Sequence, residues 1–473
     1  MDIQTSIQDT MAYMKETLRL DANFDIIYRT FTIKGRMAVI FCVDGFTQDD
    51  MLERLLQYMM EGVGDPFPED AHAFSKTMLP YAEIGLMDNY ESVLVSLLSG
   101  ISILFVDGYE KALSIDCRTY PARNVQEPDK DKVMRGSRDG FVETLVYNTA
   151  LIRRRIRDPK LTMEMHRAGR RSATDIVVCY IEDRVDRELL QEVCRRIDRL
   201  EVDALTMNQQ SLAECLFPYK WYNPFPKFKY TERPDAAAAT ILEGKIVILV
   251  DNSPSAMLLP SSIFDIVEEA DEYYFPPVTG TYLRLSRMLI AIATLQLTPI
   301  WLLLVQNPQW LPHWMEFTRI QEPVNIPIVV QLLLLELAID GLRLAAVNTP
   351  NMLSTPFSVL AALVLGEFSV RSGWFNSETM LYMAFVAVAN YTQASFELGY
   401  ALKFMRMIIL FLTALGNVWG FLLGEGITVV ALLTNQTISG GSYLDPLIPF
   451  RWDRLKRRFF RTRLPHGEKN VRS

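Results

Sequence analysis

The chain has 473 residues, 49 % of them hydrophobic, and its 48 basic and 56 acidic residues give a net charge of −8. An acidic balance without a basic, aromatic-rich stretch argues against nucleic acid as a partner. The five cysteines are odd in number and form no Cys-x-x-Cys pair, so they imply neither a disulfide framework nor a zinc site and indicate a reducing compartment.

The charges are distributed unevenly along the chain. Residues 1–286 hold 33 basic and 45 acidic residues, a net charge of −12, whereas residues 287–450 hold only six basic and nine acidic residues. The segment from Arg451 onward holds nine basic and two acidic residues and nets +7. This pattern is typical of a membrane protein with a large soluble N-terminal region. Because the first twenty residues lack the basic start and apolar core of a secretory signal, we expect that region to be cytoplasmic.

The acidic half is predicted to be α/β. Two β-branched, aromatic runs, residues 25–33 and 36–43, predict a hairpin that turns at Lys34-Gly35. A helix is predicted over 47–63, and a second pair of strands over 100–108 and 111–121. The following segment, 121–140, is rich in proline, glycine and charge and is predicted to link two subdomains.

A second α/β subdomain is predicted after this linker. It begins with a helix over 138–158 and continues with strands over 173–183 and 244–252. Two further helices, over 186–200 and near Pro234, separate these strands. The predicted architecture is therefore an α/β cytoplasmic region of two subdomains followed by a polytopic membrane domain of five to six helices. The expected boundaries are 1–130, 131–285, 286–450 for the membrane domain, and 451–473 for a basic cytoplasmic tail.

Six stretches of the apolar half are long enough to cross a hydrocarbon core. Four of them carry no charge: 288–305, 379–396, 407–424 and 427–444. The other two, 325–348 and 356–373, contain charged residues. Six spans would leave both ends of the chain in the cytoplasm, as the basic tail favours, whereas five would place the tail outside. We predict six spans, which places Lys403 and Arg406 at the cytoplasmic side.

Three charged residues of the 325–348 segment share one helical face. Glu336, Asp340 and Arg343 are separated by four and three residues. Each costs about 2.5–3.5 kcal/mol in lipid, so a compensating environment is required. One interpretation is an interfacial helix in which Arg343 pairs with Asp340 or Glu336. A second places these charges at an aqueous path or at a gate between subunits, and a third is a buried structural pair.

The 356–373 segment carries a narrow stripe of mostly small residues. Its members recur at steps of four and three residues: Ser358, Ala362, Leu365, Ser369 and Ser372. Such a stripe favours close helix packing, because small residues let backbones approach. It equally suits the lining of a pore in a ring of subunits, with Leu365 as a hydrophobic constriction. Glu367 and Arg371, one turn apart, can pair or set the charge near the pore mouth.

Motifs of enzymatic chemistry are missing from the sequence. Its four histidines lack metal-ligand spacing, and no nucleotide-binding loop or nucleophile motif is present. We therefore predict a protein that is not an enzyme and uses no cofactor or metal. The apolar half is expected to act in transport, sensing or assembly.

Residues 135–156, RGSRDGFVETLVYNTALIRRRI, resemble the signature of the A subunits of bacterial spore germination proteins, the GerA family. The matching positions are Arg135, Gly136, Gly140, Phe141, Val142, Glu143, Asn148, Ala150, Leu151, Ile152, Arg153, Arg154, Arg155 and Ile156. Similarity continues through the Glu336 helix to the DPLIPF stretch and covers nearly the whole chain. The Glu336 helix itself departs from receptor A subunits, which tend to carry Arg-Glu-Ala where this chain has IDGLRLAAVN.

The resemblance implies an integral protein of the spore inner membrane, the cell membrane of the forespore. It further implies a homo-oligomer, a pentamer in this family, that conducts monovalent cations and promotes germination together with another membrane protein of the germination machinery. The alternatives are a non-conducting assembly protein for germination receptors or for dipicolinic acid release, and a secondary transporter.

Overall fold

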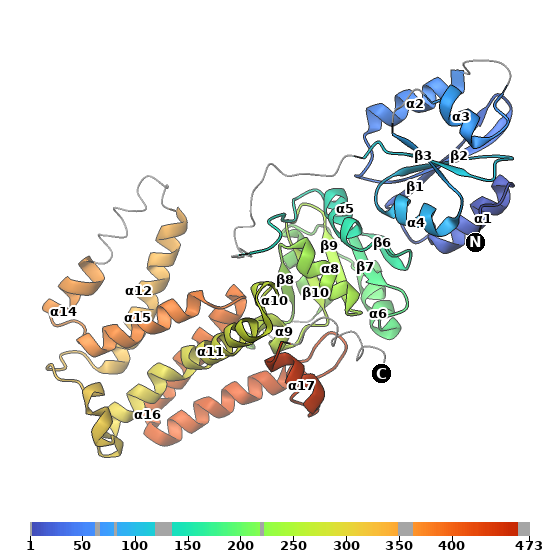
Figure 1. The fold of residues 1–473 in the computed structure, drawn as a ribbon. Helices are drawn as coiled ribbons and strands as arrows, with labels where there is room; N and C mark the ends of the chain where they lie inside the picture. Colours follow the sequence, from blue (N-terminus) through green and yellow to red (C-terminus); the bar gives the residue numbers. More distant parts are fainter. Residues whose placement is uncertain are drawn as a thin grey trace. The chain divides into compact units, whose positions relative to one another are not determined.

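A computed structural model describes residues 2–61, 67–79, 83–118, 135–217, 222–348 and 363–461, the last range with side chains from Gly366. The chain divides into two compact units. The first lies within residues 1–219 and 228–260 and contains the α/β elements. The second lies within residues 220–227 and 261–473 and is helical (Figure 1).

The first sheet of the α/β unit is antiparallel and has the strand order β1-β2-β4-β5-β3. Its strands are β1 (Ile26–Ile33), β2 (Arg36–Val43), β3 (Ile84–Met87), β4 (Ser102–Val106) and β5 (Ala112–Ile115). Its helices are α1 (Ile7–Thr17), α2 (Asp49–Glu61), α3 (Ala71–Thr77) and α4 (Tyr90–Leu98). Alternate residues of β2 face opposite sides: Val39 and Phe41 pack with α1 and α4, whereas Ala38 and Ile40 pack with α2 and α3. The sheet is therefore covered on both faces.

The second sheet repeats the topology of the first. Its order, β6-β7-β9-β10-β8, is the same order with each strand replaced by its counterpart, and all its pairings are antiparallel. The strands are β6 (Leu161–Ala168), β7 (Thr174–Ile181), β8 (Lys229–Thr231), β9 (Ile246–Val250) and β10 (Ala256–Leu259). The helices are α5 (Leu145–Arg155), α6 (Arg187–Asp198), α7 (Asn208–Leu216) and α8 (Pro234–Leu242). The α/β unit is thus a structural duplication, although we identified no internal repeat in the sequence.

The predicted first hairpin is confirmed. β1 and β2 pair in register from Ile26 opposite Val43 to Ile33 opposite Arg36. Lys34 and Gly35 form the two-residue turn with φ angles of +46° and +87°, the left-handed values that match the twist of the flanking strands. The helix predicted over 138–158 is shorter, because residues 137–142 lie outside any helix or strand and α5 begins only at Leu145. Most of the predicted linker, residues 121–134, lies outside the described residues.

The helical unit contains more helix than the charge-free windows indicated. Its helices are α9 (Ile263–Val267), α10 (Asp271–Tyr274), α11 (Pro277–Gln306), α12 (Ile328–Asn348), η3 (Leu363–Phe368, π-helical), α14 (Ser369–Arg371), α15 (Ser377–Tyr391), α16 (Phe396–Thr434) and α17 (Trp452–Phe459). Short 3-10 turns, η1 (Pro308–Trp310) and η2 (His313–Thr318), follow α11. Within the described ranges, two helices are long and apolar enough to cross a membrane, α11 and α16.

α16 is a helical hairpin. Asn417 has non-helical angles (φ +49°, ψ −127°), and the helix on either side of it is regular. Beyond this residue the chain returns along itself, because Gly420 lies against the carbonyl of Leu412 and Gly424 against Ile409. Farther from the turn, Leu402 and Met405 share a core cluster with Ala431 and Leu432. The two arms, 396–416 and 418–434, are therefore antiparallel.

This hairpin corrects the last two predicted spans. The predicted span 407–424 includes the turn at Asn417, and the predicted span 427–444 continues ten residues past the end of the helix at Thr434. The predicted spans are displaced because the first arm contains Lys403 and Arg406, which a charge-free window excludes. The count of five to six membrane helices is not confirmed.

The ends of the helical unit also differ from the expected boundaries. The unit includes residues 220–227, and its main segment begins at Ser261 rather than at 286, because α9 and α10 belong to it. The start of the basic tail belongs to the same unit. Arg458 of α17 forms ion pairs with Asp265 (2.7 Å) and Glu268 (2.9 Å) of the α9 region. The remainder of the tail, 462–473, lies outside the described residues.

Candidate functional site

The family-like motif of residues 135–156 builds the entry into α5. Asn148 accepts a hydrogen bond from the Val142 amide (2.8 Å) and donates one to the Val142 carbonyl (2.6 Å). Phe141 is buried in the second core, and Gly140 is buried beside it. The carbonyl of Glu143 accepts a hydrogen bond from the Asn252 amide (2.8 Å). These residues fix a non-helical loop against the second sheet, which is a structural role.

The three consecutive arginines of the motif have different environments. Arg155 pairs with Asp139, whose pKa would be raised by burial but is lowered below its ordinary value by hydrogen bonds from Arg155 and Ser137. Arg154 is exposed. Arg153 is fully buried and forms a bidentate pair with the buried Asp25, Nε to Oδ2 at 3.0 Å and Nη2 to Oδ1 at 3.2 Å.

The Arg153–Asp25 pair joins the two sheets of the α/β unit. Arg153 also donates to the carbonyl of Leu161 in β6 (3.1 Å), and Asp25 directly precedes β1. Asn23 adds a second link, because its side-chain oxygen accepts a hydrogen bond from the Met163 amide (2.6 Å). Both links are buried, so the two subdomains fold around shared polar contacts.

We expect Arg153→Met to destabilise the α/β unit by about 3–5 kcal/mol, because it leaves the Asp25 carboxylate buried without its partner. The measurement is the thermal unfolding of the purified full-length chain. Arg154→Met, at the exposed neighbouring position of α5, is the control and should change stability little. The double variant Asp25→Leu, Arg153→Met should recover part of the loss. Equal melting temperatures of Arg153→Met and Arg154→Met would contradict the role assigned to Arg153.

A neutral cluster of four charges lies inside the helical unit. Glu336 of α12 is 2 % exposed and pairs with Arg406 of α16, Oε1 to Nη2 at 2.5 Å and Oε1 to Nε at 2.7 Å. Lys403 forms ion pairs with Asp340 and, at 3.4 Å, with Glu336. Lys403 and Arg406 also donate to the carbonyls of Glu336 (3.0 Å) and Thr294 (2.6 Å). The cluster therefore ties α12 and α11 to the first arm of the hairpin.

The interpretation in which Arg343 pairs with Asp340 or Glu336 is wrong. The Arg343 guanidinium lies over three aromatic rings, those of Tyr391 (4.7 Å to the ring centroid), Tyr400 (5.1 Å) and Phe396 (5.9 Å). Both acids are instead neutralised by the α16 cations. Lys403 and Arg406 are themselves buried within the helical unit.

Cation–carboxylate clusters of this kind satisfy charges that would otherwise be costly in an apolar unit. Only one of the four side chains reaches the surface: that of Asp340 is 31 % exposed, whereas those of Glu336, Lys403 and Arg406 are at most 4 % exposed. Asp340 is therefore the member through which solvent or a neighbouring molecule can act on the cluster.

The predicted small-residue stripe is only partly described. Ser358 and Ala362 lie outside the described residues, as does the side chain of Leu365. Ser369 and Ser372 donate to the carbonyls of Gly366 (3.2 Å) and Ser369 (3.1 Å) in the same turn. The predicted pairing of Glu367 with Arg371 is confirmed by a 2.7 Å contact, on side chains that are half or more exposed.

A second group of charges lies where the helical unit begins. Glu272 of α10 is fully buried and pairs with Arg284 (2.6 Å) and Arg287 of α11. Burial raises the pKa of the Glu272 carboxyl above its usual value, although both arginines act in the opposite direction. Arg284 also donates to the carbonyls of Arg457 (3.1 Å) and Arg458 (3.2 Å) of α17. These contacts anchor the C-terminal helix to the start of α11.

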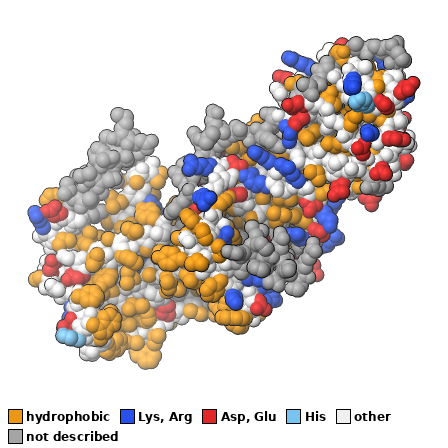
Figure 2. All heavy atoms as spheres, in the orientation of Figure 1, with side chains coloured by type: hydrophobic (Ala, Val, Ile, Leu, Met, Phe, Trp, Pro, Cys, Tyr) orange, Lys and Arg blue, Asp and Glu red, His pale blue; other side chains and the backbone are white. Residues whose placement is uncertain are grey.

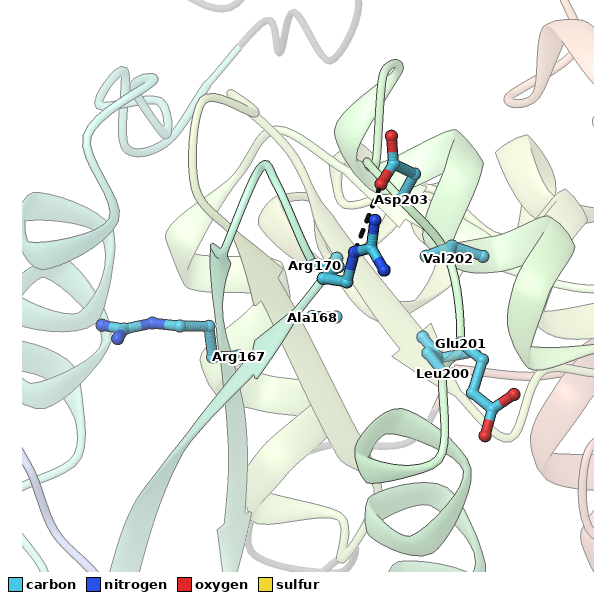
Figure 3. A pocket seen from close by; sticks show the side chains of 8 residues that line it. Arg167, Ala168, Arg170, Leu200, Glu201, Val202 and Asp203 are labelled. Carbon is cyan, nitrogen blue, oxygen red and sulfur yellow. Dashed lines mark ion pairs between the residues drawn. The ribbon is translucent and has the colours of Figure 1, made fainter.

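The α/β unit carries an open, shallow pocket at the β6–β7 turn (Figure 3). Residues 167–170 form one wall and residues 200–203 the other. Arg170 points toward Asp203, 3.7 Å away, and Arg171 pairs with the same carboxylate at 3.2 Å. Because these charges compensate one another at an exposed position, the pocket presents no convergent set of catalytic groups.

Large apolar side chains gather on the surface of the helical unit. Figure 2 shows hydrophobic atoms spread over this unit, whereas charged atoms of both signs are interspersed over the α/β unit. Among the most exposed are Leu289 (67 %), Leu337 (70 %), Val347 (80 %), Leu381 (67 %), Leu415 (73 %) and Trp419 (80 %). An apolar exterior of this extent requires lipid or protein as its neighbour.

A charged α/β unit joined to an apolar-surfaced helical unit that neutralises its own charges is typical of a membrane protein with a large polar domain. The comparisons with known proteins identify the particular family. Residues 12–472 match the family model described as Bacillus/Clostridium GerA spore germination protein, so the chain belongs to the GerA family. The resemblance drawn from residues 135–156 is thereby confirmed.

The chain is also similar to individual proteins. The chain is 36 % identical to stage V sporulation protein AF of Bacillus subtilis over 96 % of this chain and 92 % of that protein. It is 26 % identical to spore germination protein KA of the same organism, over 97 % and 85 %. The crystal structure of the N-terminal domain of the A subunit of the Bacillus megaterium spore germinant receptor GerK3 is matched with 25 % identity and a TM-score of 0.43, over 55 % of this chain and 96 % of that one.

Proposed function

We propose that this chain is a membrane subunit of a spore germination complex. In this proposal it assembles into a ring of identical subunits in the spore inner membrane and conducts monovalent cations. The observation that carries the proposal is the Glu336–Asp340–Lys403–Arg406 cluster, buried in a helical unit whose outer surface is apolar. Family membership supports a role in germination, and the cluster supplies a candidate device for controlling ion passage.

The helical unit is suited to a bilayer. α11 has 30 residues, about 45 Å of helix, which exceeds the roughly 30 Å of a hydrocarbon core. The arms of the α16 hairpin, residues 396–416 and 418–434, correspond to about 31 and 26 Å and approach that thickness individually. Apolar side chains cover the outside of these helices, and the buried cations meet their carboxylates inside. Both features support a membrane position.

The exposed flank of α12 is the surface that we assign to a second copy of the chain. One side of α12 is buried in its own bundle through Gln331, Leu332 and Glu336. The adjacent side presents Leu337 and Leu344, which are 70 % and 63 % exposed. Asp340 lies between these two sides. A neighbouring subunit on this flank would therefore cover the one solvent-accessible member of the charge cluster.

The segment after α12 is the proposed pore lining, formed by Ser358, Ala362, Leu365, Ser369 and Ser372. The interior of the helical unit also contains polar oxygen atoms outside this segment. Asn390 Oδ1 and Gln393 Oε1 of the α15 region are buried and accept no hydrogen bond from the described residues. Oxygen acceptors in an apolar surrounding suit the passage of partly dehydrated cations.

We expect Asp340→Asn to increase the resting efflux of potassium. The Asp340–Lys403 pair is assigned to the closed state, and a pair worth about 1.4 kcal/mol shifts a closed–open equilibrium about tenfold when it is lost. The measurement is potassium efflux from cells that express the full-length chain, with membrane insertion and oligomer size verified. Glu316→Gln is the matched control, because Glu316 is an exposed acid of η2 outside the cluster.

The oligomer size and the efflux together separate the alternatives. A ring that carries no current, with or without Leu365→Ala or Asp340→Asn, would contradict conduction and favour an assembly protein for germination receptors or for dipicolinic acid release. A monomer or dimer with saturable transport would favour a secondary transporter. Because we place the chain in a germination complex, the same assay includes co-expression with candidate membrane proteins of the germination machinery.

A further inference from the structure

Three potential metal ligands meet between β6 and α6 of the α/β unit. Glu164 and His166 are two residues apart on β6 and therefore lie on the same face of the sheet. Cys194 comes from α6, which packs on that face. One ligand atom from each residue lies within 4.8 Å of the other two. The set combines an imidazole, a thiol and a carboxylate.

The orientation of His166 is fixed by a fourth residue. Asp198 is one helical turn beyond Cys194 on α6, and its Oδ1 is 2.8 Å from His166 Nδ1. A carboxylate at this distance accepts a hydrogen bond from the protonated Nδ1, so the lone pair of the neutral imidazole is on Nε2. The carboxylate–histidine arrangement is the one that commonly orients histidine ligands of zinc.

The Nε2 atom of His166 is buried and makes no hydrogen bond with any described residue. The His166 side chain is only 6 % exposed, and the nearest carboxylate oxygen to Nε2 is Glu164 Oε1, 3.5 Å away. A buried nitrogen acceptor that faces a thiol and a carboxylate without a donor lacks the partner that buried polar groups normally have. A metal ion would supply that partner for all three groups.

We propose that Glu164, His166 and Cys194 bind a divalent transition metal of the Zn²⁺ class, with Asp198 as the positioning residue. Thiolate and imidazole ligands favour zinc over magnesium or calcium, and three protein ligands leave a fourth position for water. Binding displaces the thiol proton of Cys194 to solvent, so metal uptake releases acid. Glu164 and Asp198 have side chains 35 % and 60 % exposed, which gives an ion access from solvent.

The metal would crosslink an edge strand to a helix. β6 is the edge strand of the second sheet, and its Met163 amide donates a hydrogen bond to Asn23 of the first subdomain. Metal binding is therefore expected to stabilise the strand through which the two subdomains are joined. This inference is independent of ion conduction, because all of its residues belong to the α/β unit.

The experiment uses the full-length chain purified in detergent, stripped with a chelator and titrated with Co²⁺ as the probe. We expect one Co²⁺ per chain, a near-ultraviolet thiolate-to-cobalt absorption band, and displacement of the band by Zn²⁺. Cys194→Ser should abolish the band. Cys215→Ser, a half-buried cysteine of α7, should retain it. Asp198→Asn should weaken cobalt binding about 10–100-fold without removing the band.

The competing interpretation is a protonated His166 between Asp198 and Glu164, which needs no metal. In that case the chain would bind no stoichiometric Co²⁺, and this result would overturn the proposal. Persistence of the band in Cys194→Ser would overturn it as well. If Cys194→Ser is too unstable for titration, thermal unfolding provides a second measurement on chains that do fold. Zn²⁺ should raise the Tm of the native chain and of Cys215→Ser, and no rise in either would contradict the proposal. Glu164→Gln, at a half-exposed position, should keep the band with weaker cobalt binding.

Discussion

Arg406→Met is expected to lower the Tm of the helical unit by roughly 10 °C. The substitution leaves Glu336 and Asp340 with Lys403 alone, so one buried carboxylate charge is uncompensated. Breaking a buried ion pair by removing one partner costs about 3–5 kcal/mol, and each kcal/mol lowers the Tm of a domain of this size by about 2–4 °C. The loss of the Arg406 hydrogen bond to Thr294 removes a further link to α11.

The control for this prediction is Arg371→Met. Arg371 also pairs with a glutamate, Glu367, but both side chains are half or more exposed and the pair joins positions one turn apart. Such pairs contribute only about 0.3–0.5 kcal/mol. The two variants therefore remove the same type of charge from a buried and an exposed pair. If both melt alike, the cluster does not stabilise the helical unit.

Two further variants separate charge balance from packing. Arg406→Lys retains the charge but not the planar, multidentate donor, so an intermediate loss is expected. Arg406→Met combined with Glu336→Leu removes a complete pair and leaves Lys403 with Asp340. This double variant should be more stable than Arg406→Met alone, because no unpaired charge remains. If the double variant folds, its oligomer size and its potassium efflux can be compared with those of the native chain. A difference would then come from the missing Glu336–Arg406 pair and not from unfolding.

The sequence predicted the local features of the charge cluster but not its partners. Helical spacing correctly places Glu336 and Asp340 on one face, because that relation depends only on the turn of the helix. Their partners, Lys403 and Arg406, lie more than sixty residues farther along the chain. Local spacing offered only Arg343, which instead contacts aromatic rings. Pairing between distant helices depends on packing that periodicity does not encode.

The same distinction explains the α/β unit. The hairpin around Lys34-Gly35 was predictable because turn residues and alternating strands are local signals. β6 was missed because Glu164, His166 and Arg167 make it too polar for a typical strand pattern. The cluster of Glu164, His166 and Cys194 joins this strand to a helix that begins after an intervening strand. An alternating Glu-x-His on one strand face was the only available signal.

The duplicated sheet order was also invisible in the sequence. The central strands β4 and β9 are buried on both faces, and many combinations of apolar residues satisfy that requirement. Topology can therefore be retained when residue identity is not. By contrast, the contacts that join the two sheets depend on particular side chains. Asp25 and Arg153 pair through directional hydrogen bonds, and Asn23 binds the Met163 amide. The motif that identifies the family includes one of them.

The largest effect outside the charge cluster is expected at Gly420. A Cβ added there would overlap the carbonyl oxygen of Leu412 on the opposite arm of the α16 hairpin. Because the obstacle is backbone, no side-chain rotation relieves it, and the arms must separate. Gly420→Ala is therefore expected to destabilise the helical unit by several kcal/mol, at least the 1–3 kcal/mol typical of overpacking. Small residues at a close helix contact serve this purpose in membrane proteins.

Gly426→Ala is the matched control in the same arm. An added Cβ at Gly426 meets no atom within 4 Å, so the variant should be neutral or stabilised by up to about 1 kcal/mol through its higher helix propensity. Thermal unfolding of the two variants beside the native chain distinguishes a hairpin from a continuous helix. If α16 were continuous, Gly420→Ala would be as harmless as Gly426→Ala, and equal melting would contradict the hairpin.

The outcome also bears on the position of α17 relative to α9. A continuous α16 of 39 residues would extend about 58 Å and carry the following segment away from its start. The hairpin instead returns the chain toward α9, where Arg458 reaches Asp265 and Glu268. The amide pair between Asn417 and Asn307, at 2.6 and 3.1 Å, fixes the turn to the end of α11. Disruption at Gly420 should therefore also release α17, which increased proteolytic cleavage between α16 and α17 would reveal.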